Sequence, residues 1–142
     1  HVKFDHDFIG RDALEQMADR PHRDKVWLVW NNEDVTRIFA SMLGDGERYK
    51  YLEMPGSHYS TLPFDKVLLD GEMVGLSTYN VYTTNVRAWF SLAMVDTAHA
   101  VDGSEVVVVW GEEDGGSSKP VVERHVQTHV RAVIHTSRPV PE

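Results

Sequence analysis

Hydrophobic and polar positions alternate along much of the second half of the chain, which is the period of a β-strand with one buried face. Two stretches depart from strict alternation. The consecutive valines of 106–109 and the mixed run 25–30 are typical of strands covered on both faces. Together the patterns predict six strands, over residues 25–30, 64–69, 73–79, 86–95, 104–110 and 121–135.

The clearest local signal lies between the second and third of these strands. Asp70 and Gly71 separate two apolar runs, and an Asp-Gly pair suits a type I′ turn because both of its central residues take positive φ. Gly75, inside the following strand, predicts a bulge or the close approach of another backbone. A polar connector at 80–85 is expected to lead into the next strand.

In the first half of the chain the apolar period becomes that of a helix. Residues 10–20 predict a short helix with apolar side chains on one side, ended by Pro21. Residues 32–43 predict a longer amphipathic helix with Asn32 as its N-cap. The loop 44–62 that follows is long and rich in aromatic side chains, which favours a packed loop.

These elements predict a mainly β fold with two short helices. The expected architecture is a six-stranded antiparallel barrel or a jelly-roll-like sandwich, with the helices packed on one side. A chain of 142 residues forms one domain or most of one. We expect a single domain over 1–142, with a helical lead-in and long loop over 1–62 and the β-barrel core over 63–136.

The net charge of −8 excludes some classes of partner. Such a chain repels the phosphate backbone of nucleic acids and anionic membrane surfaces, so neither is expected as a partner. No stretch reaches the roughly 20 apolar residues that span a bilayer, and no cysteine is present. A cytoplasmic location is therefore expected. His1 is not methionine, so we expect a processed chain or part of a longer one.

Two groups of residues invite a metal or phosphate hypothesis, each beside a structural alternative. His125, His129 and His135 share one face of the last predicted strand, but four residues of strand span roughly 13 Å, too far for one ion. A solvated polar face is the alternative. The glycine-rich loop 111–119 is superficially like a phosphate cradle, whereas its acidic residues and Pro120 favour an ordinary hairpin loop.

Three further groups leave a catalytic or binding alternative open. Ser57 and His58 place a hydroxyl beside an imidazole, although adjacent residues rarely point together. The sequence 5–7 (Asp-His-Asp) is either an acid-base group or a cap of the first helix. A set of tyrosines either stacks on a flat ligand or packs structurally. Its members are Tyr49, Tyr51, Tyr59, Tyr79 and Tyr82.

Taken in order, several short motifs resemble the C-terminal domain of the glycine cleavage T-protein (aminomethyltransferase) family. The motifs are Asp7-Phe8-Ile9-Gly10-Arg11 with Ala13-Leu14, Gly71, Val74-Gly75, Ser77-Thr78, Leu92-Ala93-Met94-Val95 and Gly103. The blocks 29–37, 59–67 and 110–128 are more similar to one branch, the tetrahydrofolate-dependent aryl O-demethylases of lignin-derived vanillate, syringate or 3-O-methylgallate. Tyr79-Asn80 and Asn85 depart from the T-protein pattern, which favours this branch.

The resemblance implies a three-part enzyme in which two upstream domains form the folate pocket and this barrel closes one side. It implies methyl transfer from an aryl methyl ether to N5 of tetrahydrofolate, with tetrahydrofolate and a small aromatic substrate held mainly by the upstream domains. The barrel alone is then expected to be inactive and able to self-associate, with no catalytic or metal-ligating residue of its own.

The same resemblance gives a set of residues expected to line the rim that faces the folate. These are Tyr59, Ser77, Thr78, Tyr79 and Asn80. Two alternatives stay open: an aminomethyltransferase domain of glycine cleavage, and a non-catalytic barrel for protein-protein contact whose exposed apolar surface serves assembly.

Overall fold

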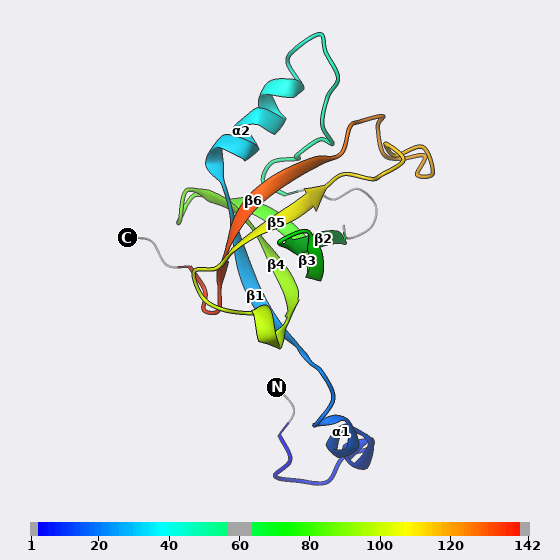
Figure 1. Ribbon diagram of the computed structural model, residues 1–142, viewed down its shortest axis with the longest axis vertical. Coiled ribbons are helices and arrows are strands. Elements are labelled where there is room, and N and C mark those ends of the chain that lie inside the picture. The colour runs from blue at the N-terminus through cyan, green and yellow to red at the C-terminus, as the bar shows by residue number, and fades with distance from the viewer. Residues whose placement is uncertain (1–2, 57–63, 140–142) are drawn as a thin grey trace.

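Six antiparallel strands close into a barrel in the computed structural model of the chain, which describes residues 3–56 and 64–139 (Figure 1). The strands follow the order β1-β4-β3-β2-β5-β6, and β6 returns to pair with β1. They are β1 (Arg23–Trp30), β2 (Asp65–Leu69), β3 (Glu72–Thr83), β4 (Ala88–Asp96), β5 (Glu105–Trp110) and β6 (Thr128–His135). The predicted mainly β fold and six-stranded antiparallel barrel are confirmed.

The barrel interior is filled by residues that lie two apart along each strand. On β1, Val26, Leu28 and Trp30 are each at most 1% exposed, as the period of an inward face requires. Trp30, Trp89 and Trp110 are the largest fully buried side chains, and the rings of Trp30 and Trp110 meet edge to face with centroids 5.6 Å apart. Each indole removes roughly 150–250 Å² from water, so these rings carry much of the core.

The predicted hairpin between β2 and β3 is confirmed. Asp70 and Gly71 form its tip with φ of 51° and 86°, the positive values that a type I′ turn needs. Gly75 also lies against another backbone, because a Cβ built on it would be 2.9 Å from Cα of Val95. The ladder with β2 shifts register beside Gly75, and Val74 is the extra residue of this bulge.

The strand β3 is longer than the sequence pattern predicts. It runs to Thr83, through residues expected to form a polar connector, so that prediction is wrong from 80 to 83. The register with β4 shifts between Ser77 and Asn80, which places polar residues inside the strand. The turn into β4 is correspondingly short and contains Arg87 with φ of 51°.

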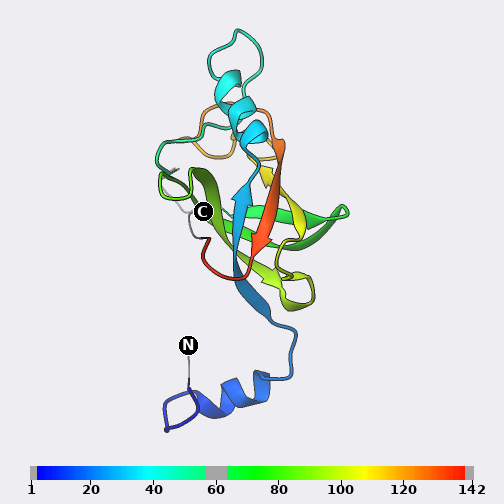
Figure 2. The ribbon, with the colours of Figure 1, turned by 90° about the vertical axis from the view of Figure 1, so that its left-hand side faces the viewer.

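The helix α2 (Asn32–Ser41) covers one end of the barrel, where it packs on β6 and β4 (Figure 2). Its N-cap is Asn31 and not the expected Asn32. The Asn31 side chain accepts hydrogen bonds from the backbone N–H groups of Glu33 and Asp34 at 3.0 and 3.1 Å, which satisfies two donors of the first turn.

The helix α1 (Arg11–Met17) is shorter than the predicted 10–20 and lies away from the barrel, at the end of an extended lead into β1 (Figures 1 and 2). None of its residues is buried. The expectation that both helices pack on one side of the barrel is therefore correct for α2 alone. A single turn of 3₁₀ helix, η1 (Thr97–His99), follows β4.

The barrel also extends beyond the expected core of 63–136. The strand β1 lies between β4 and β6, with Val29 opposite Phe90 on one side and Val133 on the other. The long loop after α2 is consequently an insertion between two barrel strands. It is not a lead-in to the barrel.

The last strand begins later than the alternating pattern predicts. β6 starts at Thr128, and residues 121–127 form an irregular segment that bridges to the long loop. His125, expected on the exposed face, is buried, whereas Val126, expected on the buried face, is 37% exposed. The pattern fails here because the backbone N–H of Val126 donates to the carbonyl of Arg48, outside the barrel ladder.

Candidate functional site

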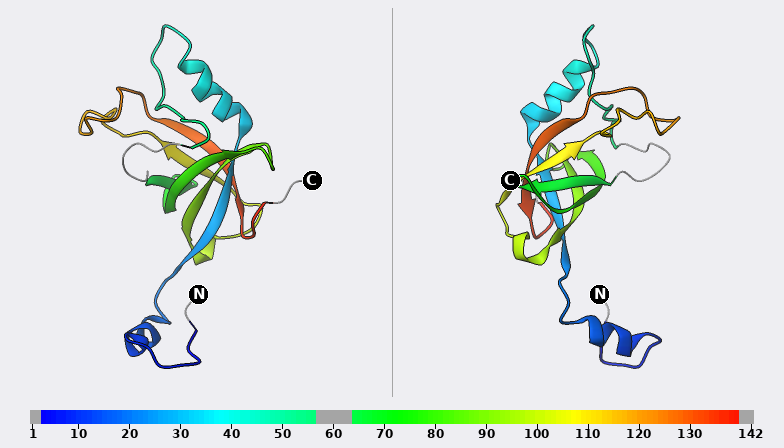
Figure 3. Two further views of the ribbon diagram at one scale, coloured as in Figure 1. Left: turned by 180° about the vertical axis from the view of Figure 1, so that it is seen from behind. Right: turned by 45° about the vertical axis from the view of Figure 1, so that its right-hand side comes forward.

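Two long connections meet at the end of the barrel that α2 covers. Figure 3 shows the segment after α2 and the β5–β6 connection side by side at this end, far from α1. Tyr49 and Val126 form a parallel bridge between the two connections, and the Val126 N–H donates to the Arg48 carbonyl at 2.8 Å. Binding and catalytic residues concentrate on loops held by a rigid scaffold, so this end is the candidate site.

Two of the expected rim residues lie inside the barrel. Ser77 and Asn80 are 0% exposed. The Ser77 hydroxyl donates to Oγ of Ser91 at 2.8 Å, and Nε1 of Trp89 donates to Oδ1 of Asn80 at 3.0 Å. Both point inward although they are three residues apart, because the bulge between them adds one residue to the two-residue period.

The residues of that bulge, Thr78 and Tyr79, are half-buried at the strand surface. The Thr78 hydroxyl donates to the Leu92 carbonyl at 3.0 Å. Gly56 lies close against the bulge, because a Cβ built on it would be 3.5 Å from the Tyr79 hydroxyl and 2.9 Å from the Asn80 carbonyl oxygen. The bulge and the long loop thus form one rim. Tyr59, also expected there, lies outside the described residues.

A buried lysine ties the long loop to the β5–β6 connection. Lys50 is 2% exposed, and its Nζ donates to Oε1 of Glu112 at 2.8 Å. The same ammonium lies 4.8 Å from the ring centroid of Trp110, whose Nε1 donates to the Lys50 carbonyl at 2.8 Å. Lys119 donates to the same Glu112 oxygen from the other side at 2.8 Å.

The two ammonium groups decide the charge state of Glu112. Burial alone would raise the pKa of this carboxyl, but the hydrogen bonds from Lys119 and Lys50 outweigh burial and lower the pKa below its usual value. Glu112 is therefore an anion shared by two cations. Sequence reasoning missed Lys50, because a lysine between two tyrosines in a loop carries no signal of burial.

His125 fixes the backbone of the β5–β6 connection at Glu112. Its side chain is 0% exposed; Nε2 accepts from the Glu112 backbone N–H at 2.9 Å, and Nδ1 lies 2.8 Å from the Glu123 carbonyl. These partners assign the proton to Nδ1. Because both ring nitrogens are engaged, His125 acts as a brace for the β5–β6 connection, and it is not on the solvated face that the sequence predicts.

Asp65 is the most perturbed carboxyl of this end. It is 6% exposed, and its Oδ2 has no hydrogen-bond partner among residues 3–56 and 64–139. Burial raises the pKa of Asp65 to about 7, against a partly compensating attraction to Lys50. Asp65 lines a cleft of about 170 Å³ together with Glu112 and Lys119. Strongly perturbed groups in a cleft are candidates for function.

The other predicted groups are not assembled into a site. His129 and His135 remain on β6, apart from the engaged ring of His125. Within the described ranges, no three or more histidine, aspartate or glutamate side chains are placed to hold a metal ion. His6 bonds to Asp5 at 2.7 Å on the exposed N-terminal segment. Ser57 and His58 lie outside the described residues.

The tyrosine set is divided between two places. Tyr49 and Tyr51 line an open groove of about 470 Å³ with Met42 and Leu43 at the end of α2. Tyr79 and Tyr82 lie on β3 instead, where the Tyr82 ring is 6.4 Å from that of Trp89. No single stack of tyrosines is therefore formed by the described members of the set.

The connection between β5 and β6 is an ordinary antiparallel return, as the alternative to a phosphate cradle requires. Asp114 organises its tip by accepting from the N–H groups of Gly116 and Ser118 at 3.0 and 3.1 Å. Among the helices of the described part of the chain, none combines the length and the apolarity that crossing a bilayer needs.

Comparison with known proteins gives relatives that match most of the chain. The chain is 49% identical over 140 residues to syringate O-demethylase of Sphingobium sp. (strain NBRC 103272 / SYK-6), a match that covers 99% of this chain and 30% of that protein. It is 37% identical over 123 residues to sesamin methylene transferase of Sinomonas sp. (strain No.22), covering 78% of this chain and 26% of that protein. No family model matches.

Both relatives are named for enzymes that take a one-carbon group from their substrate, and the chain spans less than a third of the length of either. The resemblance to aryl O-demethylases drawn from short motifs is thus confirmed by identity along nearly the whole chain. By sequence, the chain is a relative of syringate O-demethylase and sesamin methylene transferase, and it matches one segment of each of those larger proteins.

Proposed function

We propose that this barrel is the C-terminal domain of a tetrahydrofolate-dependent O-demethylase, which moves a methyl group from a methoxylated aromatic compound to tetrahydrofolate. The observation that carries the proposal is the 49% identity to syringate O-demethylase over 99% of the chain. Glycine-cleavage aminomethyl transfer is the less favoured activity, because both relatives are named for other one-carbon transfers.

The rim formed by the β3 bulge and Gly56 is where the barrel would meet the folate. A flat ring system fits one feature of this rim, the half-buried ring of Tyr79. Thr78 and Tyr79 would form the wall, and Ser77 and Asn80 would hold that wall in place from inside the barrel.

Tetrahydrofolate, when bound, supplies the nitrogen that accepts the methyl group. The contribution of this chain is positional. A methyl transfer between two bound molecules is accelerated most by holding the two reactants in line. A rim that is already fixed by a buried hydrogen-bonded layer loses little conformational entropy when a ligand binds. The layer of Ser77, Ser91 and Trp30 is such a support, since Nε1 of Trp30 also donates to Ser91 Oγ at 3.0 Å.

A chimera tests the domain role directly. The segment of syringate O-demethylase that matches this chain is replaced by the chain itself, and demethylation of syringate is measured with and without tetrahydrofolate. We expect folate-dependent activity within about tenfold of the parent enzyme. A folded chimera that binds neither syringate nor tetrahydrofolate would contradict the proposal, and the parent with its own segment re-inserted is the control.

The rim itself is tested by anaerobic calorimetry with tetrahydrofolate. In the active chimera, Tyr79→Ala is expected to weaken tetrahydrofolate binding by roughly ten- to a hundredfold, because stacking of one heterocyclic ring on an aromatic side chain is worth about 1–3 kcal/mol. Tyr82→Ala, on the same strand but packed against Trp89, is the matched control. Equal losses in both variants would mean that the rim is structural. Titration of the isolated chain shows what share of the pocket it carries.

A non-catalytic contact role is the second candidate, and α1 is the observation that favours it. Ile9 is 106% exposed, Leu14 is 39% exposed and Met17 is 41% exposed on a segment that lies away from the barrel (Figure 2). Such apolar side chains are typical of a surface that meets another domain or another copy. Sedimentation of the isolated chain across a hundredfold range of concentration tests this role, and a strict monomer at every concentration would count against it.

A further inference from the structure

One outer face of the barrel is apolar across three neighbouring strands. Buried and outward positions alternate along β1 and β4, and residues that lie opposite each other in a ladder share a face. Trp27 of β1 lies opposite Leu92 of β4, and Met94 of β4 lies opposite Leu76 of β3. With the next outward pair of the β1–β4 ladder, the outer apolar face consists of Trp27, Val29, Leu76, Phe90, Leu92 and Met94.

Neither helix of the described chain covers the outer apolar face. The helix α2 covers an end of the barrel, and α1 lies away from the barrel (Figures 1 and 2). Met94 is 39% exposed, and the other five residues of the face are half-buried. The outward positions of an antiparallel sheet that meets water are normally polar. A contiguous apolar patch at such positions marks an interaction surface.

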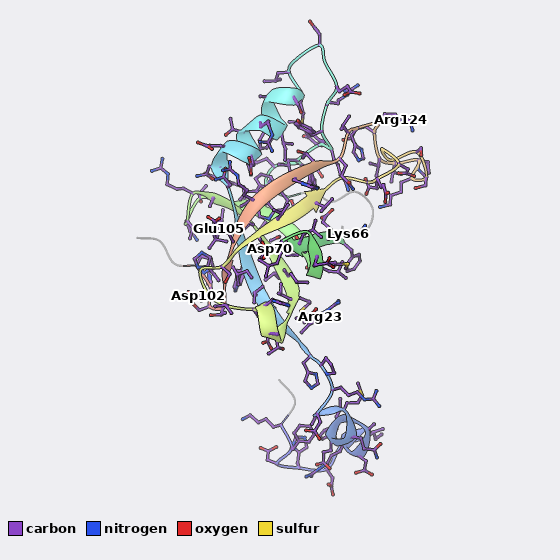
Figure 4. The ribbon with its side chains drawn as sticks, in the orientation of Figure 1. Arg23, Lys66, Asp70, Asp102, Glu105 and Arg124 are labelled. Atoms are coloured by element: carbon purple, nitrogen blue, oxygen red, sulfur yellow. The ribbon has the colours of Figure 1, made fainter. Side chains whose placement is uncertain are left out.

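A pocket of about 300 Å³ opens at one end of this face. Trp27 and Phe90 line it, and their ring centroids are 5.2 Å apart. Arg138 lines the same pocket, where it makes neither a hydrogen bond nor an ion pair with residues 3–56 and 64–139. At the other end of the face, Arg23 is paired with Asp96 at 2.8 Å (Figure 4). Because a guanidinium is always charged, the Arg138 end favours a carboxylate on the surface that covers it.

The length of the relatives indicates what that surface belongs to. The chain spans less than a third of either relative, so in those proteins the matching segment is joined to a much larger body. A covalently joined body has a high effective concentration at the face, which favours it over separate molecules. A second copy fits less well. A two-fold dimer would bring the same face against itself, and among the described residues neither the face nor its pocket carries a carboxylate for Arg138.

We propose that the rest of the O-demethylase chain docks on the outer apolar face, through an apolar surface that places a carboxylate against Arg138. The inference rests on the proposed function, since it takes this chain as one domain of that larger enzyme. It adds which side of the barrel meets the remainder of the enzyme, and which charged group that remainder presents.

Hydroxyl-radical footprinting of the isolated chain and of the chimera with syringate O-demethylase tests the surface. Tryptophan, phenylalanine and methionine side chains react rapidly wherever water reaches them, and an added dosimeter equalises the radical dose. Trp27, Phe90 and Met94 are expected to react at least about fivefold more slowly in the chimera, because the centre of a protein interface excludes water. Equal reactivity in the two proteins would overturn the proposal.

Concentration separates the proposed occupant from a second copy. The isolated chain is footprinted across a hundredfold range of concentration, and the reactivity of the face is expected to stay constant. Protection that already appears in the isolated chain and rises with its concentration would assign the face to a dimer and overturn the proposal.

Leu92→Lys places a charge at the centre of the face. In the isolated chain this position points outward, so the variant is expected to melt within about 5 °C of the unaltered chain. In the chimera it is expected to restore the reactivity of Trp27 and Met94 to that of the isolated chain, because docking would bury the new charge. Full protection retained by the Leu92→Lys chimera would contradict the proposal.

Arg138→Glu tests the charge of the occupant. In the chimera it is expected to raise the reactivity of Trp27 at least about threefold, because two carboxylates would then face each other. Arg124→Glu reverses an exposed cation on the β5–β6 connection, at the opposite end of the barrel from Arg23 (Figure 4), and is the matched control. Equal effects of the two reversals would overturn the assignment of a carboxylate to the occupant.

Demethylase activity is measured on the same chimera, so that the two proposals are judged separately. An active chimera whose face stays reactive overturns the docking surface alone, and an inactive chimera whose face is protected overturns the methyl transfer alone. If the chimera does not fold, the intact syringate O-demethylase is footprinted at the positions that align with the face. Full reactivity at those positions overturns the docking surface, and protection supports it.

Discussion

At the scale of single residues, burial places Asp65 in a state that stability measurements can detect. In the folded chain burial raises the pKa of Asp65 to about 7 from its usual 3.8. Between these values the folded state keeps a proton that the unfolded state has lost. Since the folded state then binds more protons, the free energy of unfolding must fall as the pH rises from about 4 to about 7.

Asp65→Asn removes this dependence, because an amide does not titrate. The unaltered chain is expected to lose up to about 4 kcal/mol of stability across this pH range through Asp65, and the variant is expected to lose correspondingly less. Urea unfolding at pH 4.5, 6 and 8 measures the slopes, with Asp70→Asn as the exposed control. Parallel slopes for the variant and the unaltered chain would show that Asp65 ionises normally.

Gly75 is the second residue whose environment leads to a prediction. A Cβ at this position would lie 2.9 Å from Cα of Val95 and 3.1 Å from Cγ2 of the same residue. Backbone cannot move aside cheaply, so Gly75→Ala is expected to destabilise the fold by about 2–4 kcal/mol.

Thermal unfolding measures the effect of Gly75→Ala. Gly44→Ala is the matched control, because a Cβ at Gly44 meets nothing within 4 Å. The control is expected to change stability little. Equal melting temperatures for the two variants would contradict the close approach between β3 and β4.

At the scale of elements, Asp34 fastens α2 to the barrel. Its side chain is 3% exposed; Oδ2 accepts from both N and Nε of Arg131 at 2.9 Å, and Oδ1 accepts from Arg37 at 2.8 Å. The hydrogen bond from the Arg131 side chain is the main cause that lowers the pKa of Asp34 to about 2, against the opposing effect of burial.

The free energy of unfolding depends on pH through Asp34 in the opposite sense to its dependence through Asp65. The carboxylate stabilises the fold fully above pH 4, and this contribution is lost as the pH falls from about 4 to 2. Asp34→Asn is expected to cost about 2–3 kcal/mol at pH 7 and little at pH 2. Glu33→Gln, a neighbour with an 84% exposed side chain, is the control. Denaturant unfolding at the two pH values measures the difference, and a cost that persists at pH 2 would assign Asp34 a role in packing only.

The elements also show how much of the structure can be predicted from sequence patterns. Hydrophobic patterns, alternating in most strands and continuous in others, located all six strands, and the Asp70-Gly71 signal located the hairpin, because both depend on local chemistry. The path of β3 through Asn80 was missed because a bulge changes the period, and a bulge depends on the partner strand. The burial of Lys50, Asp65 and His125 was missed for a related reason: each is buried by a segment remote in sequence. Four of the residues expected at the rim lie at the bulge between Ser77 and Asn80, which the sequence did not predict there, and the cleft that Asp65 lines was not predicted either.

At the scale of the whole molecule, the strand seams differ in length. β1 and β4 pair over seven residue pairs, from Arg23 with Asp96 to Val29 with Phe90, whereas β2 and β5 pair only at Val67 with Val108 and Leu68 with Val107. A short seam with an open cleft is expected to separate before the barrel as a whole unfolds.

Native-state hydrogen exchange tests this order of opening. Amides of the β2–β5 seam are expected to exchange at least about tenfold faster than those between β1 and β4, with a smaller dependence on denaturant, because they open locally. Equal protection at both seams would mean that the barrel opens as one unit.

The pairing of β1 with β6 also affects how the barrel folds during synthesis of the chain. The first strand of the barrel finds one of its two partners at Thr128–His135, more than a hundred residues later in the chain. On the ribosome, β1 therefore emerges long before its second neighbour exists, and its edge stays open throughout. A premature stop before β6 would release a sheet with two unpaired edges, β1 and β5, and such edges join to other chains. Complete synthesis of β6 therefore decides whether this domain closes into a barrel or aggregates through its open edges.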